Sequence, residues 1–82
     1  MRIIDEIPHE RFKITVFSWN EKYIVKFEIA DYEQVYKFNQ KNIKSVNDLK
    51  TFLMKEDFLS NVMQRFLTMR SDHLEIVKNV EL

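Results

Sequence analysis

The chain contains two histidines, the residue type whose side chain gains and loses a proton near neutral pH. His9 follows Asp5 and Glu6 and precedes Glu10, so carboxylates that could bind a metal ion surround it in sequence. Their spacing corresponds to no established metal motif, because the ligands of such motifs recur at fixed offsets. We therefore expect an exposed histidine in an acidic segment, with no metal and no cofactor.

His73 follows Asp72 and comes two residues after Ser71, which suggests a nucleophile and its base. Residues two apart on a helix do not face each other, however, so the Ser71 hydroxyl would point away from the imidazole. The chain also lacks glycine, which phosphate-binding loops need where the backbone approaches the ligand. We therefore expect no catalytic residue, no nucleotide-binding loop and no enzymatic activity.

The 82 residues are 45% hydrophobic and 32% charged, which is the balance of a globular domain. We expect a single domain over residues 1–82, with an N-terminal arm over 1–9, a β-meander over 11–38 and helices over 46–80. So short a chain has a thin core, and the absence of cysteine excludes disulfides. Self-association is the common source of added stability that remains.

Nothing in the sequence indicates a membrane. The first residues lack the apolar run of a signal peptide, and no stretch approaches the roughly 18 apolar residues of a membrane span. We therefore expect a cytoplasmic protein with no membrane partner.

Residues 11–19 and 22–30 alternate between apolar and polar side chains, as half-buried strands do. Asn20 and Glu21 predict a two-residue hairpin loop between them, because asparagine tolerates the left-handed backbone that such loops need. This register places Lys13 opposite Glu28 on one face. The other face then consists of the pairs Phe12–Ile29, Ile14–Phe27, Val16–Val25 and Ser18–Tyr23.

Residues 33–38 predict a third strand that extends the same apolar face. A short loop at residues 31–32 sets three neighbour pairs, namely Tyr36–Phe27, Phe38–Val25 and Lys37–Lys26.

Two helices should follow the strands. We expect a short one over residues 46–54 with Ser45 as N-cap, or Asn47 as the alternative cap, and a long one from about Asp57, its N-cap, to Val80. A continuous helix would place Glu56 in the apolar stripe, so we predict a break. The fold class is therefore α+β in the order β-β-β-α-α, a three-stranded antiparallel meander with both helices packed on one face.

The long helix carries an apolar seam with heptad spacing, whose members are Leu59, Val62, Phe66, Met69, His73, Ile76 and Val80. Two interpretations remain open, because the seam either packs on the sheet as an ordinary core stripe or joins two copies of the chain. A helix of about 24 residues is ~36 Å long, whereas an eight-residue strand is ~27 Å long. The last turns should therefore overhang the sheet, and we expect a homodimer interface along the seam, with His73 fixing its register.

The outer face of the sheet, opposite the helices, combines aromatic, aliphatic and basic side chains. This outer-face patch consists of Phe17, Trp19, Ile24, Lys13, Lys26 and Lys37. Three explanations remain open: the arm covers the patch with its isoleucines Ile3, Ile4 and Ile7, a protein partner binds it, or single-stranded nucleic acid stacks on its rings. The zero net charge of the chain disfavours nucleic-acid binding.

Residues 7–23 contain short runs that form a hairpin signature. The runs are Ile7-Pro8-His9, Phe12-Lys13-Ile14-Thr15-Val16-Phe17, Trp19-Asn20 and Lys22-Tyr23. In these runs the chain resembles a small family of bacterial domains of unknown function, which implies a fold and no activity. The sequence thus predicts a non-enzymatic protein-interaction domain, a homodimer, with single-stranded nucleic-acid binding or membership of a larger hetero-assembly as alternatives.

Overall fold

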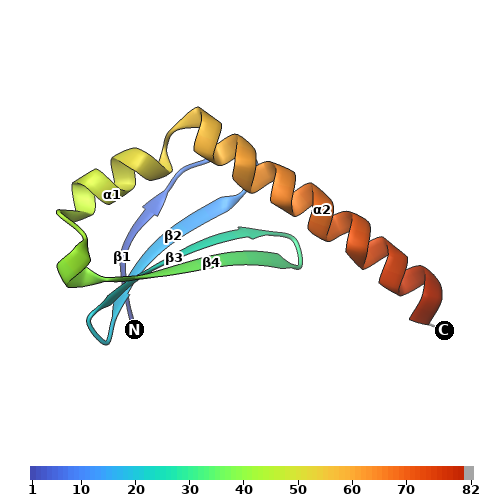
Figure 1. The fold of residues 1–82 in the computed structure, drawn as a ribbon, viewed down its shortest axis with the longest axis horizontal. Helices are drawn as coiled ribbons and strands as arrows, with labels where there is room; N and C mark the ends of the chain where they lie inside the picture. Colours follow the sequence, from blue (N-terminus) through green and yellow to red (C-terminus); the bar gives the residue numbers. More distant parts are fainter. Residues whose placement is uncertain (81–82) are drawn as a thin grey trace.

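The computed structural model describes residues 1–80, which form four strands followed by two helices (Figure 1). The strands are β1 (Arg2–Ile7), β2 (Lys13–Trp19), β3 (Lys22–Ile29) and β4 (Tyr32–Asn39), in that order across one antiparallel sheet. A short 3-10 helix, η1 (Gln40–Asn42), leads to α1 (Val46–Leu53) and α2 (Glu56–Val80). The α+β class and the break between the helices are confirmed, but the sheet has one strand more than the three expected.

The additional strand is β1, in the segment that the sequence predicts to be an N-terminal arm. It pairs antiparallel with β2, so that Ile7 lies opposite Ile14. A bulge interrupts the ladder between Ile3 and Asp5. The extra residue shifts the alternation of side chains by one, and this hides the period of two by which a strand is identified. Of the three explanations for the outer-face patch, the structure excludes cover by the arm, because β1 lies beside β2 at the edge of the sheet.

The β2–β3 hairpin has the predicted register, with Lys13 opposite Glu28 and Trp19 opposite Lys22. Asn20 and Glu21 form its loop at φ values of 52° and 64°. Both lie in the left-handed region that two-residue hairpin loops favour. In a chain without glycine, asparagine is the residue best able to take this geometry, so it marks the loop in the sequence.

The register between β3 and β4 differs from the predicted one by two residues. The observed neighbours are Tyr36–Val25, Phe38–Tyr23 and Lys37–Ile24. The loop consists of Ala30, with φ of 52°, and Asp31, whereas Tyr32 already belongs to the strand. A shift of two keeps every side chain on its predicted face, because side chains alternate with a period of two.

Both helices begin close to the predicted positions. Ser45 is the N-cap of α1, and its hydroxyl accepts a hydrogen bond from the Asp48 amide at 3.0 Å. α2 begins at Glu56, so Asp57 lies in its first turn and is not the cap. Both carboxylates there face the positive end of the helix dipole, which stabilises the start of the helix.

The core lies between one face of the sheet and the two helices (Figure 1). Its buried side chains come from three strands, the β1–β2 connection and both helices: Ile7, Phe12, Ile14, Val16, Val25, Phe27, Leu53, Val62 and Phe66. The ring of Phe12 lies 6.0 Å from that of Phe27 and 5.8 Å from that of Phe66. Burial of apolar surface contributes about 25 cal/mol per Å². The buried rings of Phe12, Phe27 and Phe66 therefore stabilise the packing of α2 on the sheet.

Polar contacts attach the helices to both edges of the sheet. Gln34 of β4 donates from Nε2 to the Val62 carbonyl at 2.9 Å and accepts from Nε of Arg65 at 3.0 Å. At the other edge, Lys50 of α1 forms an ion pair with Asp5 of β1. The hydrogen bond from Lys50 lowers the pKa of the Asp5 carboxyl below its ordinary value. The ion pair therefore stabilises the fold fully when the pH is above the ordinary pKa of aspartate. This stabilisation is lost as the pH falls through the lowered pKa of Asp5.

Thr15 provides a test of packing on the face opposite the helices. It is 2% exposed, and within residues 1–80 its hydroxyl has no hydrogen-bond partner. An unpaired buried hydroxyl is unfavourable, and valine has the same shape without it. We expect Thr15→Val to raise the free energy of unfolding, measured in urea, by about 1 kcal/mol.

Thr51→Val is the control, since it removes an exposed hydroxyl that donates to the Asn47 carbonyl at 2.8 Å. It should bring no gain. A Thr15→Val protein less stable than the original chain would show that the Thr15 hydroxyl does have a partner.

Candidate functional site

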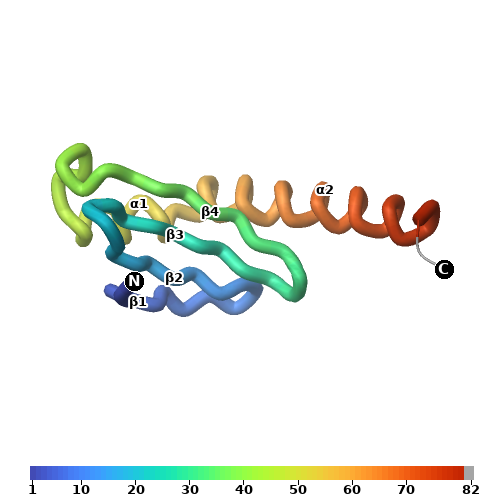
Figure 2. Tube along the Cα trace, turned by 90° about the horizontal axis from the view of Figure 1, so that it is seen from below, coloured from blue at the N-terminus to red at the C-terminus, as the bar shows by residue number. Residues whose placement is uncertain are grey.

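α2 passes over the sheet and continues beyond it, so the predicted seam divides into two parts (Figure 2). In the first part, Val62 and Phe66 are 0% and 2% exposed, and Leu59 and Met69 pack against the core cluster. The seam is an ordinary core stripe here. Val62 and Phe66 are covered by their own chain and are not available to a second copy.

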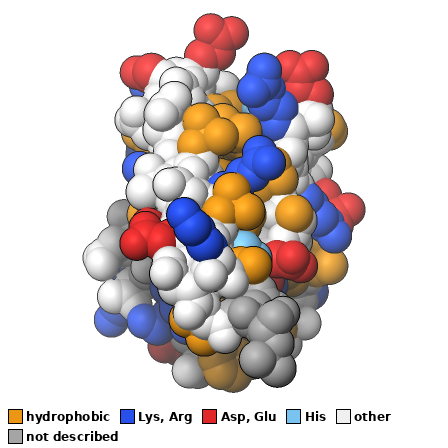
Figure 3. Space-filling model, turned by 90° about the vertical axis from the view of Figure 1, so that its right-hand side faces the viewer, with side chains coloured by type: hydrophobic (Ala, Val, Ile, Leu, Met, Phe, Trp, Pro, Cys, Tyr) orange, Lys and Arg blue, Asp and Glu red, His pale blue; other side chains and the backbone are white. Residues whose placement is uncertain are grey.

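The second part of the seam lies on the overhanging turns. His73 marks the boundary, because its ring meets the Tyr32 ring edge-on with centroids 5.4 Å apart. Beyond it, the seam residues Ile76 and Val80 are 60% and 73% exposed, and we call these two residues the overhang patch. Seen from this end of the molecule, apolar side chains are exposed among charged ones (Figure 3).

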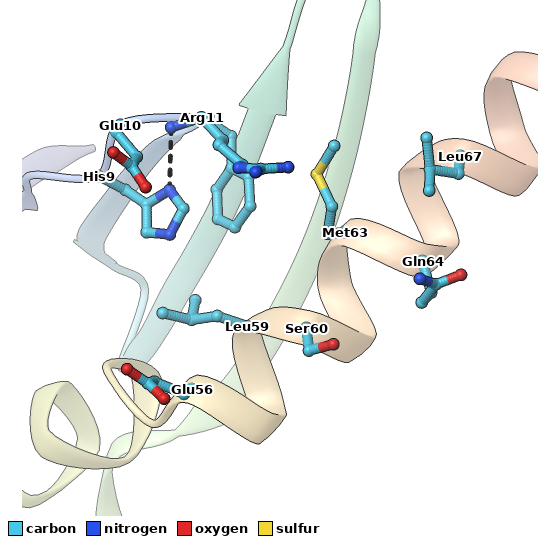
Figure 4. Close-up of a pocket in the computed structure, with 10 residues that line it drawn as sticks. His9, Glu10, Arg11, Glu56, Leu59, Ser60, Met63, Gln64 and Leu67 are labelled. Atoms are coloured by element: carbon cyan, nitrogen blue, oxygen red, sulfur yellow. Dashed lines mark hydrogen bonds between the residues drawn. The ribbon is translucent and has the colours of Figure 1, made fainter.

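A groove of about 410 Å³ lies between the β1–β2 connection and the first half of α2 (Figure 4). His9 on one wall stacks on Phe12 with ring centroids 4.2 Å apart, and its Nδ1 accepts a hydrogen bond from the Arg11 amide at 3.1 Å. An Nδ1 that accepts leaves the proton of the neutral ring on Nε2. Ser60 is on the α2 wall, and no hydrogen bond within residues 1–80 joins it to His9. The groove therefore has no assembled pair of nucleophile and base.

The acidic residues around His9 do not converge either. In the part of the chain that the structure describes, no group of three or more histidine, aspartate or glutamate side chains is placed to hold a metal ion. Glu6 instead pairs with Lys13 and Asp5 with Lys50.

The outer-face patch lies on neighbouring strands, as the hairpin register requires. Phe17 and Ile24 are directly opposite each other, and Ile24 is 4% exposed although both helices are on the other face. The Lys26 Nζ lies over the Phe17 ring, 5.6 Å from its centroid. Trp19, at the end of β2, is 51% exposed. Adjacent side chains thus cover the middle of this face, and an aromatic ring remains accessible at one end.

Two of the three lysines in the patch form ion pairs. Lys13 lies 3.4 Å from Glu6, and Lys26 lies 3.8 Å from Glu33. A surface that binds nucleic acid combines stacking rings with positive charge that is available to phosphates. Because glutamates neutralise these two lysines, the charge of the patch counts against nucleic acid.

A second depression, which is apolar and was not predicted from the sequence, lies at the junction of α1, α2 and β4. It has a volume of about 270 Å³ and is lined by Tyr36, Phe38, Leu49, Phe52, Leu53 and Phe58. Phe52 is 51% exposed, with its ring 5.4 Å from that of Phe58. The signal in the sequence that could have indicated it is the concentration of aromatic residues in β4 and around the helix break.

No protein-family model matches the chain. The comparisons with curated proteins and with solved structures also found no match. The resemblance of residues 7–23 to bacterial domains therefore stays a prediction. Within residues 1–80, no helix combines the length and the apolar character needed to cross a bilayer.

The outer-face patch can be tested through Trp19, the single tryptophan of the chain. Because Lys13 and Lys26 are paired, we expect Trp19 fluorescence to stay unchanged when single-stranded RNA or DNA is added at low salt. A variant with Glu6→Gln and Glu33→Gln frees both lysines and serves as the comparison. A quench of the original chain that saturates with oligonucleotide and reverses with salt would contradict the expectation.

Proposed function

We propose that this chain is a non-enzymatic, cytoplasmic protein-interaction domain that forms a homodimer through the C-terminal part of α2. The observation that carries the proposal is the overhang patch, whose Ile76 and Val80 are 60% and 73% exposed beyond the edge of their own sheet. Burying a large aliphatic side chain contributes about 1.5–3 kcal/mol, so a partner that covers these residues gains that stabilisation.

A second copy fits the patch because it carries the same apolar stripe. Two helices packed antiparallel about a twofold axis bring each stripe against the other. The helix around the patch carries both signs of charge, with Arg70 and Lys78 as well as Asp72 and Glu75. A second copy therefore does not meet a surface of uniform like charge, which would oppose association.

Two alternatives use surfaces of the same chain. A subunit contact in a larger hetero-assembly would use the outer-face patch, whose Trp19 is 51% exposed. Single-stranded nucleic acid on the outer face has the exposed Trp19 in its favour and the ion pairs of Lys13 and Lys26 against it.

Sedimentation equilibrium over a range of concentrations tests the homodimer. We expect a dimer at tens of micromolar, and we expect Ile76→Lys to weaken it by about tenfold or more because a charge replaces an apolar contact. The stability of the monomer should not change, since Ile76 is 60% exposed there.

Ser71→Lys is the matched control. It adds the same charge to an exposed position of the same helix, outside the seam, and should leave the dimer intact. An original chain that stays monomeric at these concentrations would overturn the proposal.

A further inference from the structure

β4 is a sheet edge that carries two charged residues, Glu33 and Lys37, but has neither a bulge nor a proline. It is eight residues long and pairs with β3 over its whole length without a bulge. The single proline of the chain is Pro8, far from this strand. Natural sheets commonly protect their edges with bulges, prolines or covering segments. The other edge, β1, has such a bulge between Ile3 and Asp5, whereas β4 has none.

Alternate residues of β4 direct their backbone groups away from β3. The Gln40 amide donates to the Glu21 carbonyl at 3.0 Å, which makes these two residues a hydrogen-bonded pair at the end of the ladder. Hydrogen-bonded pairs alternate along an antiparallel ladder, so even-numbered residues of β4 bond to β3. The N–H and C=O groups of Glu33, Val35 and Lys37 therefore point outwards. Val35, in the middle, is 45% exposed.

α2 covers the face of β4 and not its edge. Arg65 reaches the Gln34 and Tyr36 side chains, at 3.0 Å and 3.2 Å, on the face that carries the helices. Glu33, Val35 and Lys37 lie on the other face, and all three are exposed.

The two charges of β4 are poorly matched within their own chain. Glu33 lies directly opposite Glu28, and Lys37 lies opposite the apolar Ile24. Like charges in directly opposite positions are destabilising. The ion pair of Glu33 with Lys26, at 3.8 Å, offsets this only in part. Both charges thus lack an opposite charge directly across the ladder.

We propose that β4 pairs antiparallel with β4 of a second copy, about a twofold axis through Val35, so that the two sheets become continuous. Glu33 of each copy then lies opposite Lys37 of the other, and the two Val35 side chains meet at the axis. Moving the axis by one residue separates Glu33 from Lys37 on both sides. The charge pattern therefore selects both the partner, which is a second copy, and the register.

This interface uses a different surface from the overhang patch and does not require it. A twofold axis perpendicular to the sheet keeps the helices of both copies on the same face and makes the two α2 helices antiparallel. α2 crosses β4, and its last turns extend past the end of the sheet beyond the β3–β4 loop (Figure 2). In the paired sheets the overhanging turns of the two copies therefore point in opposite directions.

Single cysteines test the register, because the chain has none of its own. Val35→Cys places two thiols opposite each other at the axis, with Cα atoms about 5.5 Å apart, which a disulfide spans. Glu33→Cys is the control, because its counterpart is then four residues away along the strand, or ~13 Å. We expect mild oxidation to give a covalent dimer of Val35→Cys and none of Glu33→Cys.

Charge reversal tests the pairing by an independent route. In the proposed dimer, residue 33 of each copy lies opposite residue 37 of the other, which gives two such pairs. Glu33→Lys and Lys37→Glu each place like charges in both pairs, so we expect each variant to weaken the dimer by about tenfold. The double variant restores opposite charges and should restore the dimer. An effect within one chain, through the Lys26–Glu33 pair, would not be rescued, because the double variant still lacks that pair.

Experiments can distinguish a dimer formed through the β4 edge from a dimer formed through the C-terminal part of α2. Cross-linking of Val35→Cys in the Ile76→Lys background supports the β4 interface independently of the helix. A dimer that is abolished by Ile76→Lys, together with no cross-link of Val35→Cys, supports the helix interface and overturns edge pairing. Equal cross-linking at residues 33 and 35, or a double charge reversal without rescue, also overturns it.

Discussion

The contact between α2 and the sheet, made by Val62 and Phe66 against Phe12 and Phe27, is the interaction on which the rest of the structure depends. It is the centre of a core with one sheet face on one side and two helices on the other. Both helices pack on the same face of the four-stranded sheet, so they leave the other face uncovered. Because the contact involves the first half of α2, it also determines that the second half extends past the sheet.

The position of the core leaves four surfaces outside it, namely the outer face of the sheet, its β1 edge, its β4 edge and the overhang patch. These surfaces differ in how far other side chains cover or pair with them. On the outer face, Ile24 is covered by its neighbours, and Lys13 and Lys26 are paired with glutamates. At the β1 edge, a bulge disrupts the ladder, and Asp5 is bound by Lys50. No comparable arrangement covers the β4 edge or the overhang patch within residues 1–80. The proposed interaction domain, whose partner would cover these two surfaces, accounts for this asymmetry.

Most of the fold could be predicted from local patterns. The β2–β3 hairpin was predictable in full because one register satisfies an apolar face and the Lys13–Glu28 pair at once, while a slip of one residue satisfies neither. β1 was not predictable in this way, because its bulge breaks the alternation. The register of β4 was wrong by two residues, because no chemical pair on β3 distinguishes the two alignments and the choice of loop residues decided between them.

The sequence by itself determined which faces are apolar, where the helix break falls, and that α2 is longer than any strand beneath it. Heptad spacing could not separate core from interface, because Val62 and Ile76 have the same place in the pattern. Only the tertiary structure decided that Val62 is buried and Ile76 is exposed, since burial depends on where the sheet ends beneath the helix. In the same way, only the order of the strands made β4 an edge and left its charges without a neighbour on one side.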